Sequence, residues 1–272
     1  MSVAEFHTTF AGGPYFNMAF DEWLLGRAMS EPGAIYLRVY TWQTSTITFG
    51  YSQKQETALD FSHLGDTPVI RRVTGGRALY HDPSELTYSI AANTDLEPGS
   101  KLGGTLSQSS RLIAEMLTET LTRLGISSDY IRHSSSREKM PDYFHKAPCF
   151  GSFSRHELQS AGRKVVASAQ KRLSSAFLQH GSVKIGGLAF HPSLPGVGMP
   201  SGAVLQAVGE KRFIDAARQF RDCFERGLDI SFVTHRLSPA DRRDLRSLEL
   251  GVKKNALKRR VIIAQFDNCV SL

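Results

Sequence analysis

The 272-residue sequence has few cysteines and no long apolar run. Its cysteines are Cys149, Cys223 and Cys269, and such an odd, sparse set argues against a disulfide framework and for reduced thiols. No apolar stretch approaches the roughly 18–20 residues needed to cross a bilayer. The first ten residues also lack the basic and then apolar pattern of a signal peptide. We therefore expect a cytoplasmic protein that is not embedded in a membrane.

The composition is that of a folded soluble chain, with 41% hydrophobic and 22% charged residues, which excludes a disordered chain. The net charge of +7 is unevenly distributed. Residues 1–100 carry 6 basic and 11 acidic side chains, residues 101–200 carry 13 and 6, and residues 201–272 carry 14 and 9. This basic excess fits a solvated surface, an acidic protein partner or nucleic acid.

Apolar periodicity predicts helices and strands in alternation. Helices are expected over residues 17–28, 107–124 and 210–226 and from Ser238 onward, and strands over 34–40, 45–49, 69–73, 85–91, 164–169 and 176–185. Gly125 stands where a glycine ends a helix, and Ser238-Pro239 is typical of a helix start. The order indicates an α/β or α+β domain built on a mixed β-sheet flanked by helices.

The first segment of chemical interest runs from Arg71 to Asp82 and contains Gly75-Gly76. Adjacent glycines let the backbone approach a ligand closely, and arginines beside such a turn bind anions or carboxylates. An ordinary glycine-rich turn with surface arginines would give the same pattern. No Walker A or dinucleotide-binding fingerprint is present, which disfavours nucleotide sites of those types.

The second segment contains Cys149, which follows a long polar stretch over residues 133–148. A cysteine at the end of such a loop is a candidate nucleophile if its pKa is lowered, although the residue alone favours a plain buried cysteine. His145 and His156 lie nearby, but the spacing matches no common zinc pattern and a fourth ligand is missing. We predict no metal site.

The third segment runs from Gly162 to Arg172 and is followed by Gln179-His180-Gly181-Ser182. Strand alternation places Lys164, Val166 and Ser168 on one face and small residues such as Ala167 and Ala169 on the other. The ammonium group of Lys164 could stabilise a thiolate or an oxyanion. A surface lysine and a structural histidine are the alternatives.

Together, these three ordered motifs resemble the biotin/lipoate protein ligase superfamily over roughly residues 12–230. The opening helix, Asn17-Met18-Ala19-Phe20-Asp21-Glu22, is similar to that of the family as well. The most specific likeness is to the cysteine-type octanoyl-[acyl carrier protein]:protein N-octanoyltransferases, because Thr74-Gly75-Gly76-Arg77 has two glycines and Pro148-Cys149-Phe150 precedes the lysine motif. The resemblance implies a ligase-like catalytic domain related to class II synthetases, over residues 32–249 with the opening helix from about residue 14. Residues 250–272 form a tail without an assignment.

The resemblance also implies roles for residues. Cys149 would carry the acyl group as a thioester, and Lys164 would lower the cysteine pKa and orient the acyl carbonyl. The implied substrate-binding residues are Arg71, Arg72, Thr74, Gly75, Gly76, His81, Ser168, Ala169, His180 and Gly181. One departure is Ala167, where the family usually has glycine, since it adds a methyl group beside the expected acyl pocket.

The implied reaction moves octanoyl from octanoyl-acyl carrier protein to a lysine of lipoyl domains, such as glycine cleavage H protein or a 2-oxoacid dehydrogenase E2. No cofactor is expected, since ATP and magnesium would enter only if the chain were a lipoate–protein ligase. An octanoyl amidotransferase and an inactive lipoyl-binding paralogue are further alternatives. We expect no nucleic-acid or membrane partner, because about 16 residues before the first helix leave no room for a DNA-binding domain. The basic half of the chain would then attract acidic carrier proteins.

Overall fold

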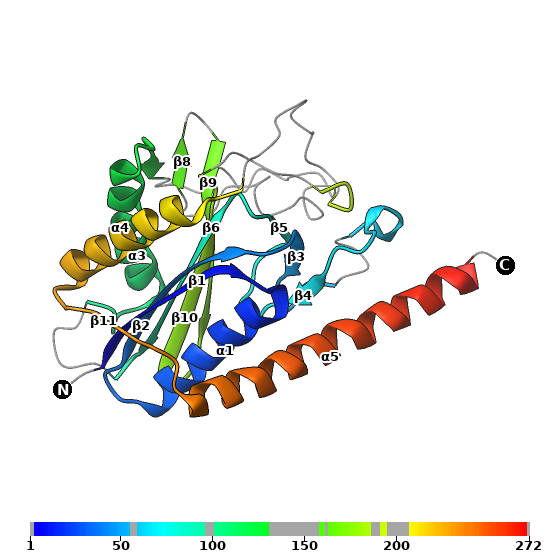
Figure 1. The fold of residues 1–272 in the computed structure, drawn as a ribbon, viewed down its shortest axis with the longest axis horizontal. Coiled ribbons are helices and arrows are strands. Elements are labelled where there is room, and N and C mark those ends of the chain that lie inside the picture. Colours follow the sequence, from blue (N-terminus) through cyan, green and yellow to red (C-terminus); the bar gives the residue numbers. More distant parts are fainter. Residues whose placement is uncertain are drawn as a thin grey trace.

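The computed structural model describes residues 3–54, 59–95, 101–130, 158–160, 163–185, 191–194 and 207–270. Its centre is an eight-stranded sheet (Figure 1). In spatial order the strands are β11 (Val233–Thr234), β1 (Ala4–Gly12), β2 (Ile35–Trp42), β6 (Leu86–Asn93), β10 (Ala176–Val183), β9 (Arg163–Arg172), β8 (Leu158–Ser160) and β7 (Asp129–Tyr130). β1 pairs in parallel with β2 and β11, whereas the other ladders are antiparallel. The predicted mixed sheet is confirmed, although no strand was predicted at β1.

A second, three-stranded sheet has the order β4 (Val69–Arg71), β3 (Thr46–Phe49) and β5 (Leu79–His81). β3 runs parallel to β4 and antiparallel to β5. A short 3₁₀ helix, Phe61–His63, precedes β4. The glycine-containing segment therefore connects two short strands of this sheet, as its sequence predicts. We call residues 72–78 the glycine turn.

Two helices, α3 (Leu106–Arg123) and α4 (Glu210–Leu228), cover one face of the large sheet (Figure 1). Ile113, Leu117 and Leu121 recur at helical spacing and are buried against the sheet. The helix α3 ends as predicted, because Gly125 follows it with a φ of 78°, a conformation that favours glycine.

The other face is covered by α1 (Pro14–Ser30), and α5 (Pro239–Val270) packs against α1. The predicted cap of α5 is confirmed, since the hydroxyl of Ser238 accepts a hydrogen bond from the amide of Asp241 at 3.2 Å. Leu245 of α5 is buried against α1. The helix α5 continues through residue 250, so the division of the chain at that position stays a prediction. Within the described residues, no helix combines the length and apolar character required to cross a membrane.

Candidate active site

A narrow cavity lies between α1, the glycine turn and the central strands. Its walls are Met18, Tyr40, Thr48, Arg72, Gly76, Leu79, His81, Thr87, Ala167, Ser168, Ala169, His180, Gly181 and Ser182. The structure thus brings together seven of the predicted substrate-binding residues: Arg72, Gly76, His81, Ser168, Ala169, His180 and Gly181. Thr74, Gly75 and Arg71 are not among the lining residues. Ala167, the departure noted in the sequence, does line the cavity.

The glycine turn is packed tightly at the cavity wall. Gly76 has a φ of 87°, and a Cβ there would lie 2.8 Å from Nη2 of Arg72. The guanidinium of Arg72 donates to the carbonyl of Gly75 through Nη2 at 2.7 Å and to that of Arg77 at 2.8 Å. Arg72 therefore holds the turn in place as well as lining the cavity.

Arg71 points elsewhere. Its Nη1 donates to the backbone carbonyls of Gly50, Tyr51 and Gln53 at 2.5–3.0 Å, and its guanidinium lies over the ring of Phe49. Arg71 thus supports the loop after β3, and its predicted role in substrate binding stays a prediction.

His180 lines the cavity and lies between a carboxylate and a hydroxyl. Its Nδ1 is 2.9 Å from Oδ2 of Asp21, and its Nε2 is 2.6 Å from the hydroxyl of Thr74. Asp21 accepts three further hydrogen bonds, from Arg38, Tyr40 and Ser89. Burial alone would raise the pKa of Asp21, but the hydrogen bond from His180 and the charge of Arg38 hold it below its usual value. Thr74 does not line the cavity, but it contacts the lining residue His180 directly.

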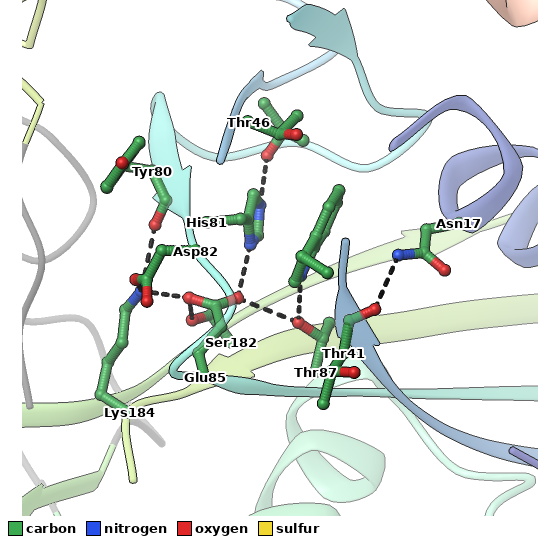
Figure 2. Close-up of polar contacts among 12 residues, drawn as sticks. Asn17, Thr41, Thr46, Tyr80, His81, Asp82, Glu85, Thr87, Ser182 and Lys184 are labelled. Atoms are coloured by element: carbon green, nitrogen blue, oxygen red, sulfur yellow. Dashed lines mark hydrogen bonds and ion pairs between the residues drawn. The ribbon is translucent and has the colours of Figure 1, made fainter. Parts of the chain in front are cut away.

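His81 also lines the cavity and makes the same kind of contacts. Its Nδ1 is 2.6 Å from Oε1 of Glu85, and its Nε2 is 2.8 Å from the hydroxyl of Thr48. Figure 2 shows Glu85 between His81 and the ammonium group of Lys184. Burial tends to raise the pKa of Glu85, but Lys184 and His81 lower it to about 2. Burial, opposed by Glu85, lowers the pKa of His81 and so favours the neutral ring, in which Nδ1 donates to the ionised Glu85.

Glu85 also connects other parts of the wall. It accepts hydrogen bonds from the hydroxyls of Thr87 at 3.0 Å and Ser182 at 2.8 Å, both of which line the cavity. The indole of Trp42 donates to Thr87 and stacks on the ring of His81. One buried carboxylate thus fixes three lining side chains.

Lys164 is buried in β9, with 2% of its surface exposed, but it does not line the described cavity. The pairing of β8 with β9 shifts by one residue between Val166 and Lys164, which makes Val165 a bulge. A bulge interrupts the alternation of side chains, so the prediction that Lys164 shares a face with Val166 does not follow from the strand period. Cys149 lies outside the described residues, as do His145 and His156.

Sequence reasoning missed Asp21, Thr48, Glu85 and Lys184 as parts of this site. Only Glu85 gave a local signal, since it follows His81 by four residues. Within the part of the chain that the structure describes, no group of three or more His, Cys, Asp or Glu side chains could hold a metal ion. The described free cysteine, Cys223, is buried on α4, and burial raises the pKa of its thiol, which makes it a poor nucleophile.

Comparison with known proteins agrees with this geometry. Residues 13–188, which include every lining residue of the cavity, match the lipoyl protein ligase A/B catalytic domain. The chain belongs to this family. Its fold is similar to that of Ta0514, a putative lipoate protein ligase from T. acidophilum with bound lipoic acid, at a TM-score of 0.66 and 18% identity over 90% of this chain and 94% of that one.

Among curated relatives of this ligase A/B family, octanoyltransferase LipM of Carboxydothermus hydrogenoformans is 42% identical over 182 residues, which are 66% of this chain and 63% of that protein. The LipM of Bacillus subtilis is 31% identical over 243 residues, 83% of this chain and 86% of that protein. The match covers slightly less than two thirds of the length of the Carboxydothermus hydrogenoformans protein and of two further LipM relatives, from Macrococcus caseolyticus and Staphylococcus epidermidis. The large mixed sheet flanked by helices is the lipoate ligase-like fold that the sequence predicts.

Proposed function

We propose that this protein is an octanoyltransferase that acts in protein lipoylation. The observation that carries the proposal is that one narrow cavity, formed entirely within the family-matched residues 13–188, exposes a lining surface that is mostly apolar. Relatives that are 42% and 31% identical are named octanoyltransferases. A saturated acyl chain suits such a cavity, because burying its methylene groups is favourable and requires few polar partners.

The donor is octanoyl-acyl carrier protein and the nucleophile is Cys149. Its thiolate attacks the thioester carbonyl, the C–S bond to the carrier breaks, and the carrier's thiolate leaves and takes up a proton. The ε-amine of a lipoyl-domain lysine then attacks the acyl-cysteine, loses a proton, and releases the Cys149 thiolate as an amide forms. Splitting the transfer in this way is covalent catalysis. The acceptors are lipoyl domains such as glycine cleavage H protein and 2-oxoacid dehydrogenase E2.

Lys164 supports the first step. A cysteine thiol has an unperturbed pKa of about 8.5, so it is mostly protonated at neutral pH. An ammonium group withdrawn from water attracts a thiolate more strongly than one on the surface does. Lys164 is 2% exposed and precedes the cavity-lining Ala167 by three residues, about 10 Å along a strand. This supports a role for Lys164 in lowering the thiol pKa and orienting the acyl carbonyl.

Thioester exchange needs no external energy source, so the proposed reaction uses neither ATP nor a metal ion. It takes place in the cytoplasm, and both partners are proteins whose acidic surfaces would favour the basic half of the chain.

The test is a transfer assay with octanoyl-acyl carrier protein and a lipoyl domain in the absence of ATP. The proposal predicts octanoylated lipoyl domain with the unaltered protein and none with Cys149→Ser, whose fold should be unchanged by circular dichroism. Transfer that requires ATP, together with octanoate-dependent ATP–pyrophosphate exchange, would instead establish a ligase. Transfer from an octanoylated lipoyl domain but not from the acyl carrier would establish an amidotransferase.

A further inference from the structure

The glycine turn is held from two directions by buried side chains. On one side, the hydroxyl of Thr74 is bound to His180. On the other side, the carbonyls of Gly75 and Arg77 accept hydrogen bonds from Arg72, which is 5% exposed. The geometry of the turn therefore depends on what fixes the guanidinium of Arg72.

A continuous chain of contacts leads from Arg72 to Lys184. Nη1 of Arg72 donates to the hydroxyl of Thr48 at 3.2 Å, and this hydroxyl lies 2.8 Å from Nε2 of His81, to which it donates when the ring is neutral. Nδ1 of His81 donates to Glu85, which forms an ion pair with Lys184 (Figure 2). The ammonium of Lys184 also donates to the carbonyl of Tyr80 at 3.0 Å. Each link has its donors and acceptors in the order that a neutral His81 requires.

The order of donors depends on the charge of His81. An imidazolium would donate through Nε2 to Thr48 instead of accepting from it, so the hydroxyl oxygen would accept from two cationic groups, His81 and Arg72. It would also place a positive charge next to the Arg72 guanidinium. The charged groups that act on the ring are Glu85, which favours the imidazolium, and Lys184 and Arg72, which oppose it. Lys184 thus keeps the ring in the state that supports Arg72.

The position of this chain of contacts matters for the reaction. Ser182, bound to Glu85, pairs with Ala167, whereas His180 pairs with Ala169. Because Lys164 lies before Ala167 in β9, the Glu85 contacts are at the end of the cavity nearer to Lys164. Under the proposed function this is the end where the acyl group reacts.

We propose that Lys184 is a positioning residue for acyl transfer: through Glu85, His81, Thr48 and Arg72 it holds the glycine turn at the reacting end of the cavity. The role in transfer rests on the proposed function, whereas the hold on the turn does not. Lys184 acts through these side chains and does not touch the substrate.

The decisive variants are Lys184→Met, Glu85→Gln and the double variant. Lys184→Met leaves the Glu85 carboxylate buried without its cation, so His81 takes up a proton and its support of Arg72 is lost. The double variant removes both charges, so nothing favours the imidazolium and the neutral ring is restored. Lys211→Met, at an exposed position on α4, is the matched control.

The first measurement is hydrogen exchange of residues 72–78 in the whole protein. Amide exchange in the glycine turn should become faster in Lys184→Met. Its rate should return most of the way to that of the unaltered protein in the double variant and stay unchanged in Lys211→Met. Equal exchange in all four proteins, or a double variant no better protected than Lys184→Met, would overturn the proposal. Circular dichroism checks that each variant is folded. If Lys184→Met does not fold, Thr48→Val still tests the proposal, because it removes the hydroxyl between Arg72 and His81 and should speed exchange of the turn, whereas Glu85→Gln, whose amide oxygen can still accept from His81, should keep the turn protected. Unchanged exchange in Thr48→Val would overturn the proposal.

The second measurement is acyl transfer as a function of pH. Misplacement of a wall of the site by about 1 Å is expected to lower transfer by about 10²-fold. In Lys184→Met, kcat should fall more than KM rises, and the acid limb of the kcat/KM profile should move to higher pH. The limb should return in the double variant. A loosened turn with unchanged transfer would contradict the positioning role, whereas absence of transfer in the unaltered protein would refute the proposed function and leave the exchange result intact.

Discussion

The two histidines that line the cavity make matching contacts, but the carboxylates that bind them pair with different cationic residues. His180 lies between Asp21 and Thr74, and His81 lies between Glu85 and Thr48. Asp21 pairs with Arg38, which is fully buried in the large sheet. Glu85 forms an ion pair with Lys184, which follows the last residue of β10. The same carboxylate–histidine–threonine arrangement thus occurs once within the large sheet and once where β6 begins and β10 ends, next to the three-stranded sheet.

This difference indicates a division of roles. The Asp21 contacts join α1, β2, β6 and β10, so their loss should affect the whole fold. The Glu85 contacts lead through His81 and Thr48 to the glycine turn, so their loss should affect the site more than the fold.

The largest expected effect separates the two carboxylates by stability. Asp21→Asn leaves Arg38 buried without its counter-charge and should lower the free energy of unfolding by about 3–5 kcal/mol. Glu85→Gln should lower it less, because Lys184 keeps the carbonyl of Tyr80 and a contact with Asp82. Urea unfolding measures both, with Asp60→Asn at an exposed site as the control. Equal losses for Asp21 and Glu85 would contradict the division of roles.

The glycine between His180 and Ser182 gives the next effect. A Cβ at Gly181 would lie 2.5 Å from the hydroxyl of Ser168 and 2.9 Å from the carbonyl oxygen of Ala167. Gly181→Ala should therefore lower stability by about 1–3 kcal/mol and weaken octanoate binding measured by calorimetry. Gly26→Ala, which meets nothing within 4 Å on the exposed side of α1, should instead stabilise by about 0.5–1 kcal/mol. Unchanged octanoate binding in Gly181→Ala would mean that the ligand does not occupy this cavity.

The pH dependence of stability distinguishes the same groups more finely. The pKa of Glu85 is lowered from 4.5 to about 2, so between these pH values the folded state binds fewer protons at Glu85 than the unfolded state does. The stability that Glu85 contributes is complete above pH 4.5 and is lost as the pH falls toward 2. The Glu85→Gln/Lys184→Met variant should therefore lose less stability over this range than the unaltered protein, as urea titrations at each pH would measure. A parallel dependence in both proteins would rule out this contribution.

The smallest effect lies outside the buried contacts. Lys171 lies with its ammonium 4.9 Å from the ring centroid of the exposed Tyr51. Lys171→Glu should raise the KM for the acyl carrier about two- to fivefold at low salt, and the difference should vanish at high salt. Lys211→Glu on α4 has the same charge change and should leave KM unchanged. If both variants behave alike, the carrier responds to net charge and not to this position.

Local patterns made much of the fold predictable. The glycine pair between two apolar runs predicted a turn between strands, and Ser238-Pro239 predicted the start of α5 because its cap is formed by neighbouring residues. The site residues near the glycine turn were predictable for the same reason. His81 and Glu85 are only four positions apart, so their contact could also have been proposed.

Other contacts join distant positions and left no local signal. Asp21 and His180 are 159 positions apart, and their pairing depends on how α1 packs on β10. The bulge at Val165 breaks the period of two on which the face of Lys164 was predicted. The strand β1 was missed because its exposed and buried positions do not alternate regularly, with Ala11 at a φ of 49° near its end.

Intact mass spectrometry after incubation with octanoyl-acyl carrier protein tests the central claim most directly. The account predicts a mass increase of one octanoyl group on the unaltered protein, its removal by hydroxylamine, and no increase on Cys149→Ser. The Lys164→Ala variant should acquire the group more slowly, because its thiol is less ionised. An octanoyl group that resists hydroxylamine, or one that forms equally on Cys149→Ser, would contradict the account.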